Sequence, residues 1–167
     1  MNNLLKQSDS GARLAPEDPW TLIREQDGEL PTGPLILPYG RWRQLQATGA
    51  PPKMSLHGVW LGPDDELESL ELWLHVLPLV ALDFPSFRDG RAYSQAYLLR
   101  TRMGWKGELR AIGDVLRDQL SHMRQCGFDS FAIRSDKSAN DALKGLAGMS
   151  VLYGRSAIEP LPLFRRR

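Results

Sequence analysis

The chain has 167 residues, of which 42% are hydrophobic and 25% charged, and this composition excludes a disordered chain, a collagen and a disulfide scaffold. Its length is typical of a single domain with its own core. Lysine and arginine total 21 against 20 aspartates and glutamates, so the net charge of +1 gives no general attraction to nucleic acid or to an anionic membrane, and we expect neither as a partner.

Strand and helix patterns alternate along the chain. Short apolar runs predict strands over residues 34–38, 56–61, 79–84, 108–112, 128–133 and 149–153. Helical spacing of apolar residues, with glycine or aspartate at several ends, predicts helices over residues 39–47, 65–77, 91–103, 114–127 and 136–147.

This alternation is typical of βαβ units, and so of an α/β fold with a mostly parallel sheet and right-handed crossovers. Residues 79–84 form a nearly continuous apolar run, as in a strand covered on both faces. About six strands are too few for a closed eight-stranded βα barrel. We therefore expect an open sheet with helices on both faces, with a partial βα barrel as the alternative.

The two ends of the chain read as tails. Residues 1–18 are mostly polar and lack the apolar stretch of about 7–15 residues that a secretory signal needs. We expect a cytoplasmic protein with a loose N-terminal tail over residues 1–18, a single α/β domain over residues 19–160 and a basic C-terminal tail over residues 161–167.

The sequence carries no recognisable redox or metal motif. Cys126 is the single cysteine, which excludes an intrachain disulfide and a dithiol, and its place before Gly127 is typical of a small buried residue. The three histidines lie on separate elements without ligand spacing, and no dinucleotide or phosphate-loop fingerprint is present. We expect no metal, haem, flavin or iron–sulfur cofactor.

Charged residues gather where three predicted strands end, which is where binding sites of parallel α/β folds lie. The candidates for this rim are Asp83, Arg88, Asp89, Arg91, Arg110, Asp114 and Arg117.

Each candidate also has a purely structural explanation. Asp89 and Asp114 stand where helix caps belong. Asp83 could pair with Arg110 or with a turn of the backbone. Arg88 and Arg91 flank the start of a helix, which suits a bound anion because the first N–H groups there are free, but a structural ion-pair network would also use them.

One central stretch is similar to a known family. Residues 83–94, 98–100, 107–119 and 126–131, which include the sequences DFPSFRDGRAYS, GELRAIGDVLRDQ and CGFDSF, resemble a bacterial family of unknown function. Its genes commonly neighbour the gene of the assimilatory sulfite (or nitrite/sulfite) reductase haemoprotein, and some members are labelled as oxidoreductases of sulfite reduction. The resemblance implies a role in sulfur assimilation.

Three interpretations follow. In the first, the protein is an accessory factor that binds the sulfite reductase haemoprotein or delivers something to it, with the rim as its contact. In the second, it is a small enzyme with Arg88 and Arg91 clamping a small anion and Asp83 or Asp114 as the acid or base. In the third, it is a structural or regulatory module without a ligand.

Overall fold

The computed structural model describes residues 3–8, 11–47, 57–146 and 152–166. Within them eight strands form one sheet in the order β2-β1-β8-β7-β6-β5-β4-β3. The strands are β1 (Leu4–Ser8), β2 (Gly11–Leu14), β3 (Thr21–Leu22), β4 (Leu35–Pro38), β5 (His57–Leu61), β6 (Leu79–Phe84), β7 (Glu108–Gly113) and β8 (Ser130–Ala132). Strands β3 to β8 run parallel, whereas β1 pairs antiparallel with both β8 and β2.

The helices fall close to their predicted positions. They are α1 (Tyr39–Ala47), the 3₁₀ helix η2 (Leu67–Trp73), α2 (Arg91–Thr101), the 3₁₀ turn η3 (Arg117–Gln119), α3 (Leu120–Cys126), α4 (Ala139–Leu146) and the 3₁₀ turn η4 (Leu163–Arg165). The segment predicted as one helix over residues 65–77 is the shorter η2. None of the helices in the described ranges is long and apolar enough to cross a membrane.

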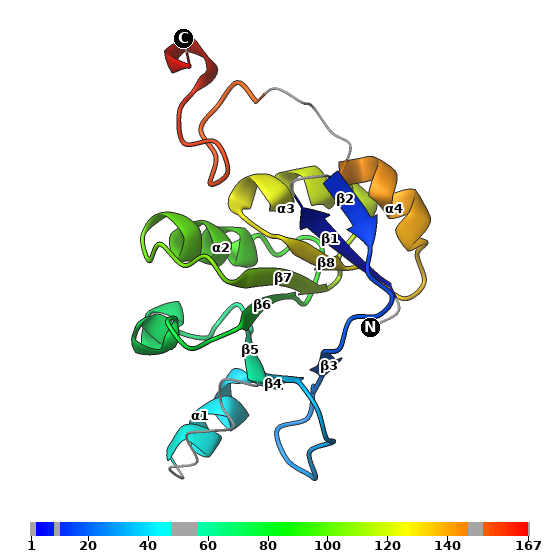
Figure 1. The fold of residues 1–167 in the computed structure, drawn as a ribbon, viewed down its shortest axis with the longest axis vertical. Coiled ribbons are helices and arrows are strands. Elements are labelled where there is room, and N and C mark those ends of the chain that lie inside the picture. The colour runs from blue at the N-terminus through cyan, green and yellow to red at the C-terminus, as the bar shows by residue number, and fades with distance from the viewer. Residues whose placement is uncertain (1–2, 9–10, 48–56, 147–151, 167) are drawn as a thin grey trace.

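The sheet curls into half a barrel, and the helices line its outer side (Figure 1). The buried apolar side chains of α1, η2, α2, α3 and α4 all belong to one core cluster. The prediction of helices on both faces is therefore wrong, and the alternative of a partial barrel describes the architecture. The physical reason is the strand order: successive parallel strands are neighbours, so crossovers of one hand all fall on the same face.

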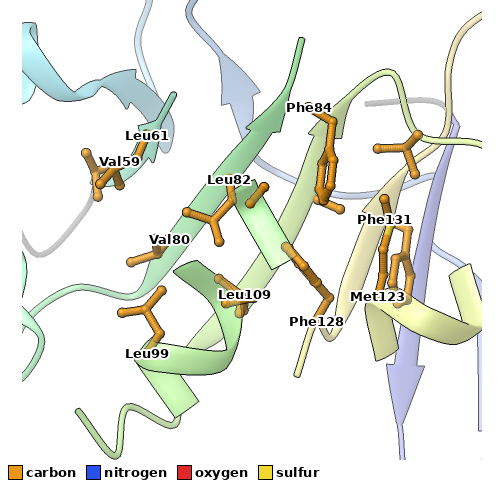
Figure 2. Close-up of a cluster of buried hydrophobic side chains, with 14 of the residues drawn as sticks. Val59, Leu61, Val80, Leu82, Phe84, Leu99, Leu109, Met123, Phe128 and Phe131 are labelled. Atoms are coloured by element: carbon orange, nitrogen blue, oxygen red, sulfur yellow. The ribbon is translucent and has the colours of Figure 1, made fainter. Parts of the chain in front are cut away.

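Alternation along the strands separates two packing layers. In β6, Val80, Leu82 and Phe84 point into the large cluster beneath the helices, and Figure 2 shows them beside Leu99 of α2 and Phe128. The alternate residues of the sheet face the inner, concave side. They form a small second cluster of Ile36, Leu79, Ala81 and Ile112, packed against Trp20, Leu22, Trp60 and Ala132.

In the part of the chain that the structure describes, connecting segments and not helices cover the inner side of the sheet. The segment between β2 and β3 runs along it (Figure 1), and the indole N–H of Trp60 donates to the carbonyl oxygen of Ile23 over 2.7 Å. The first residues are part of the sheet: Leu4 and Leu5 of β1 are fully buried. The expectation of a loose tail over residues 1–18 is thus wrong, because this hairpin supplies the edge that β8 needs as a partner.

The C-terminal part also departs from the prediction. Residues 149–151 of the last predicted strand lie outside the described residues, and Leu152 and Tyr153 form no strand. The expected basic tail contains η4, and Arg166 donates from its Nε to the carbonyl oxygen of Leu161 over 2.7 Å. Its guanidinium is therefore part of a folded loop and not a solvated end.

Candidate functional site

Two of the predicted rim residues meet where β6 and β7 end. Asp83 is the penultimate residue of β6, and the backbone N–H of Asp114 donates to the carbonyl oxygen of Phe84 over 2.7 Å. Gly113, the last residue of β7, pairs with Phe84 at the end of β6 and has a φ of +90°, a conformation that glycine adopts without strain. The structure therefore brings Asp83 and Asp114 to one edge of the sheet.

Asp114 organises the loop that follows β6, residues 85–90, which we call the Phe87 loop. One carboxylate oxygen of Asp114 accepts the backbone N–H of Phe87 over 2.8 Å, and the side-chain amide of Gln119 donates to the Phe87 carbonyl over 3.0 Å. The other oxygen of Asp114 accepts from Arg134 over 2.7 Å. Both backbone polar groups of Phe87 are thus held from the next βα connection.

The Phe87 loop displays an aromatic ring and a cation. The Phe87 side chain is 49% exposed, and the guanidinium of the exposed Arg88 lies 5.4 Å from the centre of its ring. Within the described residues Arg88 has no carboxylate partner. Of the predicted anion-binding arginines, Arg88 alone presents its charge to solvent without such a neighbour.

The other charged rim residues are engaged with one another. Arg91 binds Asp89 over 2.7 Å and also pairs with Asp64, while Asp89 accepts the backbone N–H of Arg91 at the start of α2. The N-cap of α2 is Gly90, so Asp89 is not the cap residue itself: from one position earlier it accepts the first N–H of the helix and pairs with the Arg91 guanidinium. Arg117 pairs with Asp141 of α4 over 3.0 Å.

Asp114 is a poor candidate for proton transfer at neutral pH. The hydrogen bond from the Phe87 backbone, followed by that from Arg134, lowers the pKa of Asp114 below its usual value. A carboxylate that two donors hold in its ionised form exchanges protons only in acid. Its geometry fits a positioning role for the Phe87 loop.

Arg110 does not reach the rim. It lies in the middle of β7 on the inner face, is fully buried, and binds Asp18 through two hydrogen bonds of 2.8 Å. It also donates to Glu108 over 2.6 Å, and Lys6 bridges Glu108 and Asp18 at 3.0 Å from each. This four-residue network, in which the side chains of Asp18 and Arg110 are fully buried and those of Lys6 and Glu108 are partly exposed, ties β7 to the N-terminal segment.

Several residues of these clusters escaped sequence reasoning. Asp83 pairs with Arg24 over 2.7 Å and not with Arg110, and Arg24 also lies 5.1 Å over the ring of Trp60. Nothing in the sequence around Arg24 or Asp18 indicates its partner. Arg24 is 59 residues from Asp83, and Asp18 is 92 residues from Arg110. Arg134 did carry a local signal, since it directly follows the strand predicted over residues 128–133.

Near these strand ends, the remaining reactive side chains among the described residues form no further centre. Cys126 is buried, and burial raises the pKa of its thiol to about 11. In the described ranges no three His, Cys, Asp or Glu side chains are grouped as metal ligands. A shallow pocket of about 280 Å³ lies at the opposite end of the parallel strands, where β7 and β8 begin. It is lined by residues that include Lys6, Lys106, Glu108 and Asp129.

The buried network predicts acid sensitivity. Burial raises the pKa values of Asp18 and Glu108, but the bonds and charges of Arg110 and Lys6 outweigh it and leave both pKa values below their ordinary 3.8 and 4.5. The unfolded chain then binds more protons than the folded one, so this stabilisation is complete above about pH 5 and is lost as the pH falls through the lowered values.

Urea unfolding between pH 7 and pH 3 measures this effect. We expect the free energy of unfolding to fall below pH 5, and to fall less steeply in Asp18→Asn, which lacks one of the two carboxyls. A wild-type free energy that stays constant down to pH 3 would contradict the assignment.

The match to known families covers most of the structure just described. A family model for bacterial proteins of unknown function, DUF934, matches residues 58–164. The chain belongs to this family. The DUF934 region begins in β5 and includes the Phe87 loop and Asp114, whereas Asp18 and Arg24 lie before it. No curated protein matches the chain significantly.

Proposed function

We propose that this DUF934 protein is a non-catalytic accessory factor of assimilatory sulfite reduction, and that it binds the sulfite reductase haemoprotein through the Phe87 loop. The observation that carries the binding role is the loop itself, in which an exposed Phe87 and Arg88 are presented on a backbone held by Asp114 and Gln119. The pathway rests on the resemblance of residues 83–131 to proteins encoded beside the haemoprotein.

The physical properties of the loop suit a protein contact. Aromatic residues and arginines are the side chains that most often dominate binding energy at interfaces. A loop already held in its bound shape loses little conformational entropy on docking, so more of the contact energy appears as affinity. The bonds from Asp114 and Gln119 to both backbone groups of Phe87 supply that pre-organisation.

The arrangement of charges favours binding over catalysis. Asp83, Asp89 and Asp114 each accept from an arginine, and Arg91 and Arg117 are each taken by carboxylates. An enzyme clamp for a small anion needs arginines that converge on an empty space. Among these candidates only Arg88 is exposed without a carboxylate partner in the described residues, which suits an acidic side chain on a partner surface.

Binding to the purified haemoprotein of the same organism tests the proposal. We expect Phe87→Ser and Arg88→Ala each to weaken binding about tenfold or more, as at interface hot spots, with unchanged melting temperatures. Tyr97→Ser is the matched control, since Tyr97 on α2 is also a half-exposed aromatic residue but lies off the loop.

Two outcomes would overturn the proposal. The first is the absence of any complex with the haemoprotein in calorimetry at micromolar concentrations. The second is a complex that Phe87→Ser and Tyr97→Ser weaken equally. As a cellular check, deletion of the gene is expected to slow growth on sulfate, with rescue by cysteine and by the wild-type gene but not by Phe87→Ser.

A further inference from the structure

The C-terminal residues 152–166, which we call the C-terminal arm, form a folded loop that projects from the domain near the end of α3 (Figure 1). Its ends are joined by the bond from the Leu163 N–H to the Tyr153 carbonyl, 3.0 Å long, and by Arg166, which donates to the Leu152 carbonyl and also pairs with Glu159. The arm is attached through the N–H of Ala157, which donates to the Gln125 carbonyl over 2.8 Å.

The arm exposes an apolar surface that also carries positive charge. Its large exposed apolar side chains are Tyr153, Ile158, Leu161, Leu163 and Phe164, with Tyr153 72% and Phe164 63% exposed. Arg155 and Arg165 are exposed on the same arm, and neither has a carboxylate partner among the described residues. Such a patch on a short loop is typical of a surface that another protein covers.

A second exposed apolar patch lies on η2 and the turn after it, and we call it the acidic face. Leu72 is 79% exposed there, and Trp73 and Val76 are more than a third exposed. Glu66, Glu68 and Glu71 lie on the same segment, are exposed, and have no cationic partner in the described part of the chain. Residues 64–76 contain no lysine or arginine.

The two patches complement each other in both properties. Each combines large exposed apolar side chains with charges of one sign that the chain itself leaves uncompensated, and the signs are opposite. Charge complementarity of this kind selects partners and orients them, while the apolar side chains supply the burial that holds them. From this we infer that the C-terminal arm of one copy docks on the acidic face of a second copy.

The folded state of the arm supports this occupant. Because the arm is closed by its own hydrogen bonds, docking does not require it to become ordered first, which lowers the entropic cost of association. One arm-to-face contact leaves an arm and a face free at the two ends. Copies therefore add head to tail, or close into a ring, as protein concentration rises.

Light scattering on the full chain, over a range of concentrations, tests the inference. We expect the mean mass to rise above 18.8 kDa with concentration, and to fall back as salt screens the charges. Glu68→Arg with Glu71→Arg, and separately Arg155→Glu with Arg165→Glu, are each expected to weaken association tenfold or more. Glu25→Arg with Glu29→Arg, exposed residues off both patches, is the matched control and should leave it unchanged.

Mixing the two charge-reversed variants gives the sharpest result. In each variant by itself, the arm and the face carry charges of the same sign and repel. In the mixture, the negative arm of one variant meets the positive face of the other, so the mixture is expected to associate. A wild type that remains monomeric at all concentrations overturns the inference, as does a mixture that stays monomeric although both variants fold and the control variant associates.

This inference stands apart from the proposed function. Phe87→Ser is expected to weaken haemoprotein binding and leave self-association intact, whereas the acidic-face variant should weaken self-association and leave haemoprotein binding intact. A failure of one proposal is therefore visible without affecting the other.

Discussion

Replacing Arg110 with alanine is expected to lower the free energy of unfolding by about 3–5 kcal/mol, the usual cost of removing one partner from a buried ion pair. The side chains of Asp18 and Arg110 are both fully buried, and within the described residues the substitution leaves the Asp18 carboxylate with Lys6 as its ion-pair partner. Denaturant unfolding followed by tryptophan fluorescence measures the loss.

Two further variants show whether the buried charge is the cause. Arg117→Ala removes an ion pair whose partners are both half-exposed, and is expected to cost at most about 1 kcal/mol. Arg110→Met combined with Asp18→Leu removes both charges and keeps apolar volume, so it is expected to be less destabilising than Arg110→Ala. A loss in Arg110→Ala no larger than in Arg117→Ala would show that the network does not stabilise the fold.

The second large effect is expected at Gly113. A Cβ atom there would overlap the carbonyl oxygen of Phe84 and lie 2.7 Å from an Asp83 carboxylate oxygen, at a φ of +90°. Backbone strain and overpacking each cost about 1–3 kcal/mol, so we expect Gly113→Ala to destabilise by about 2–6 kcal/mol. Because the Phe84 carbonyl also accepts the N–H of Asp114, the Phe87 loop should shift and bind its partner more weakly.

Gly104 provides the matched control for this substitution. It also has a positive φ, of +64°, but a Cβ atom there meets nothing within 4 Å. Gly104→Ala is therefore expected to cost only the backbone term, about 1–2 kcal/mol, and to leave haemoprotein binding unchanged. Equal losses at the two glycines would mean that the close approach at Gly113 relaxes without consequence.

Local signals were sufficient for the central strands and helices. The apolar run of residues 79–84 and the helix from Arg91 appear where the sequence places them, because a strand buried on both sides and a helix after Gly90 are each determined by neighbouring residues. The curl of the sheet and its single helical face depend on the order of strands in space. That order is not a property of any one segment.

The sequence around each residue also did not predict the antiparallel strands at the edge of the sheet or the partners of the charged residues. In the strand Leu4–Ser8 only Leu4 and Leu5 are apolar and buried. The other three residues are polar and half-buried, so the sequence shows no apolar run that would predict a strand. Asp114 was expected to cap a helix, and it instead accepts an N–H from Phe87, 27 residues earlier. A carboxylate accepts a backbone N–H in the same way whether the donor is in the next helix or in a distant loop. The sequence alone therefore does not show which donor Asp114 binds.

The position of β1 between β2 and β8 has a consequence for synthesis on the ribosome. Strands β3 to β8 can each add to the neighbour made just before, so this part of the sheet grows as the chain emerges. The β1–β2 hairpin leaves the ribosome before them, but its place in the sheet exists only once β8 has been made. Leu4 and Leu5 stay without their final cover until more than a hundred further residues have been added, so over that interval the nascent chain carries an apolar pair that lacks its partner strand.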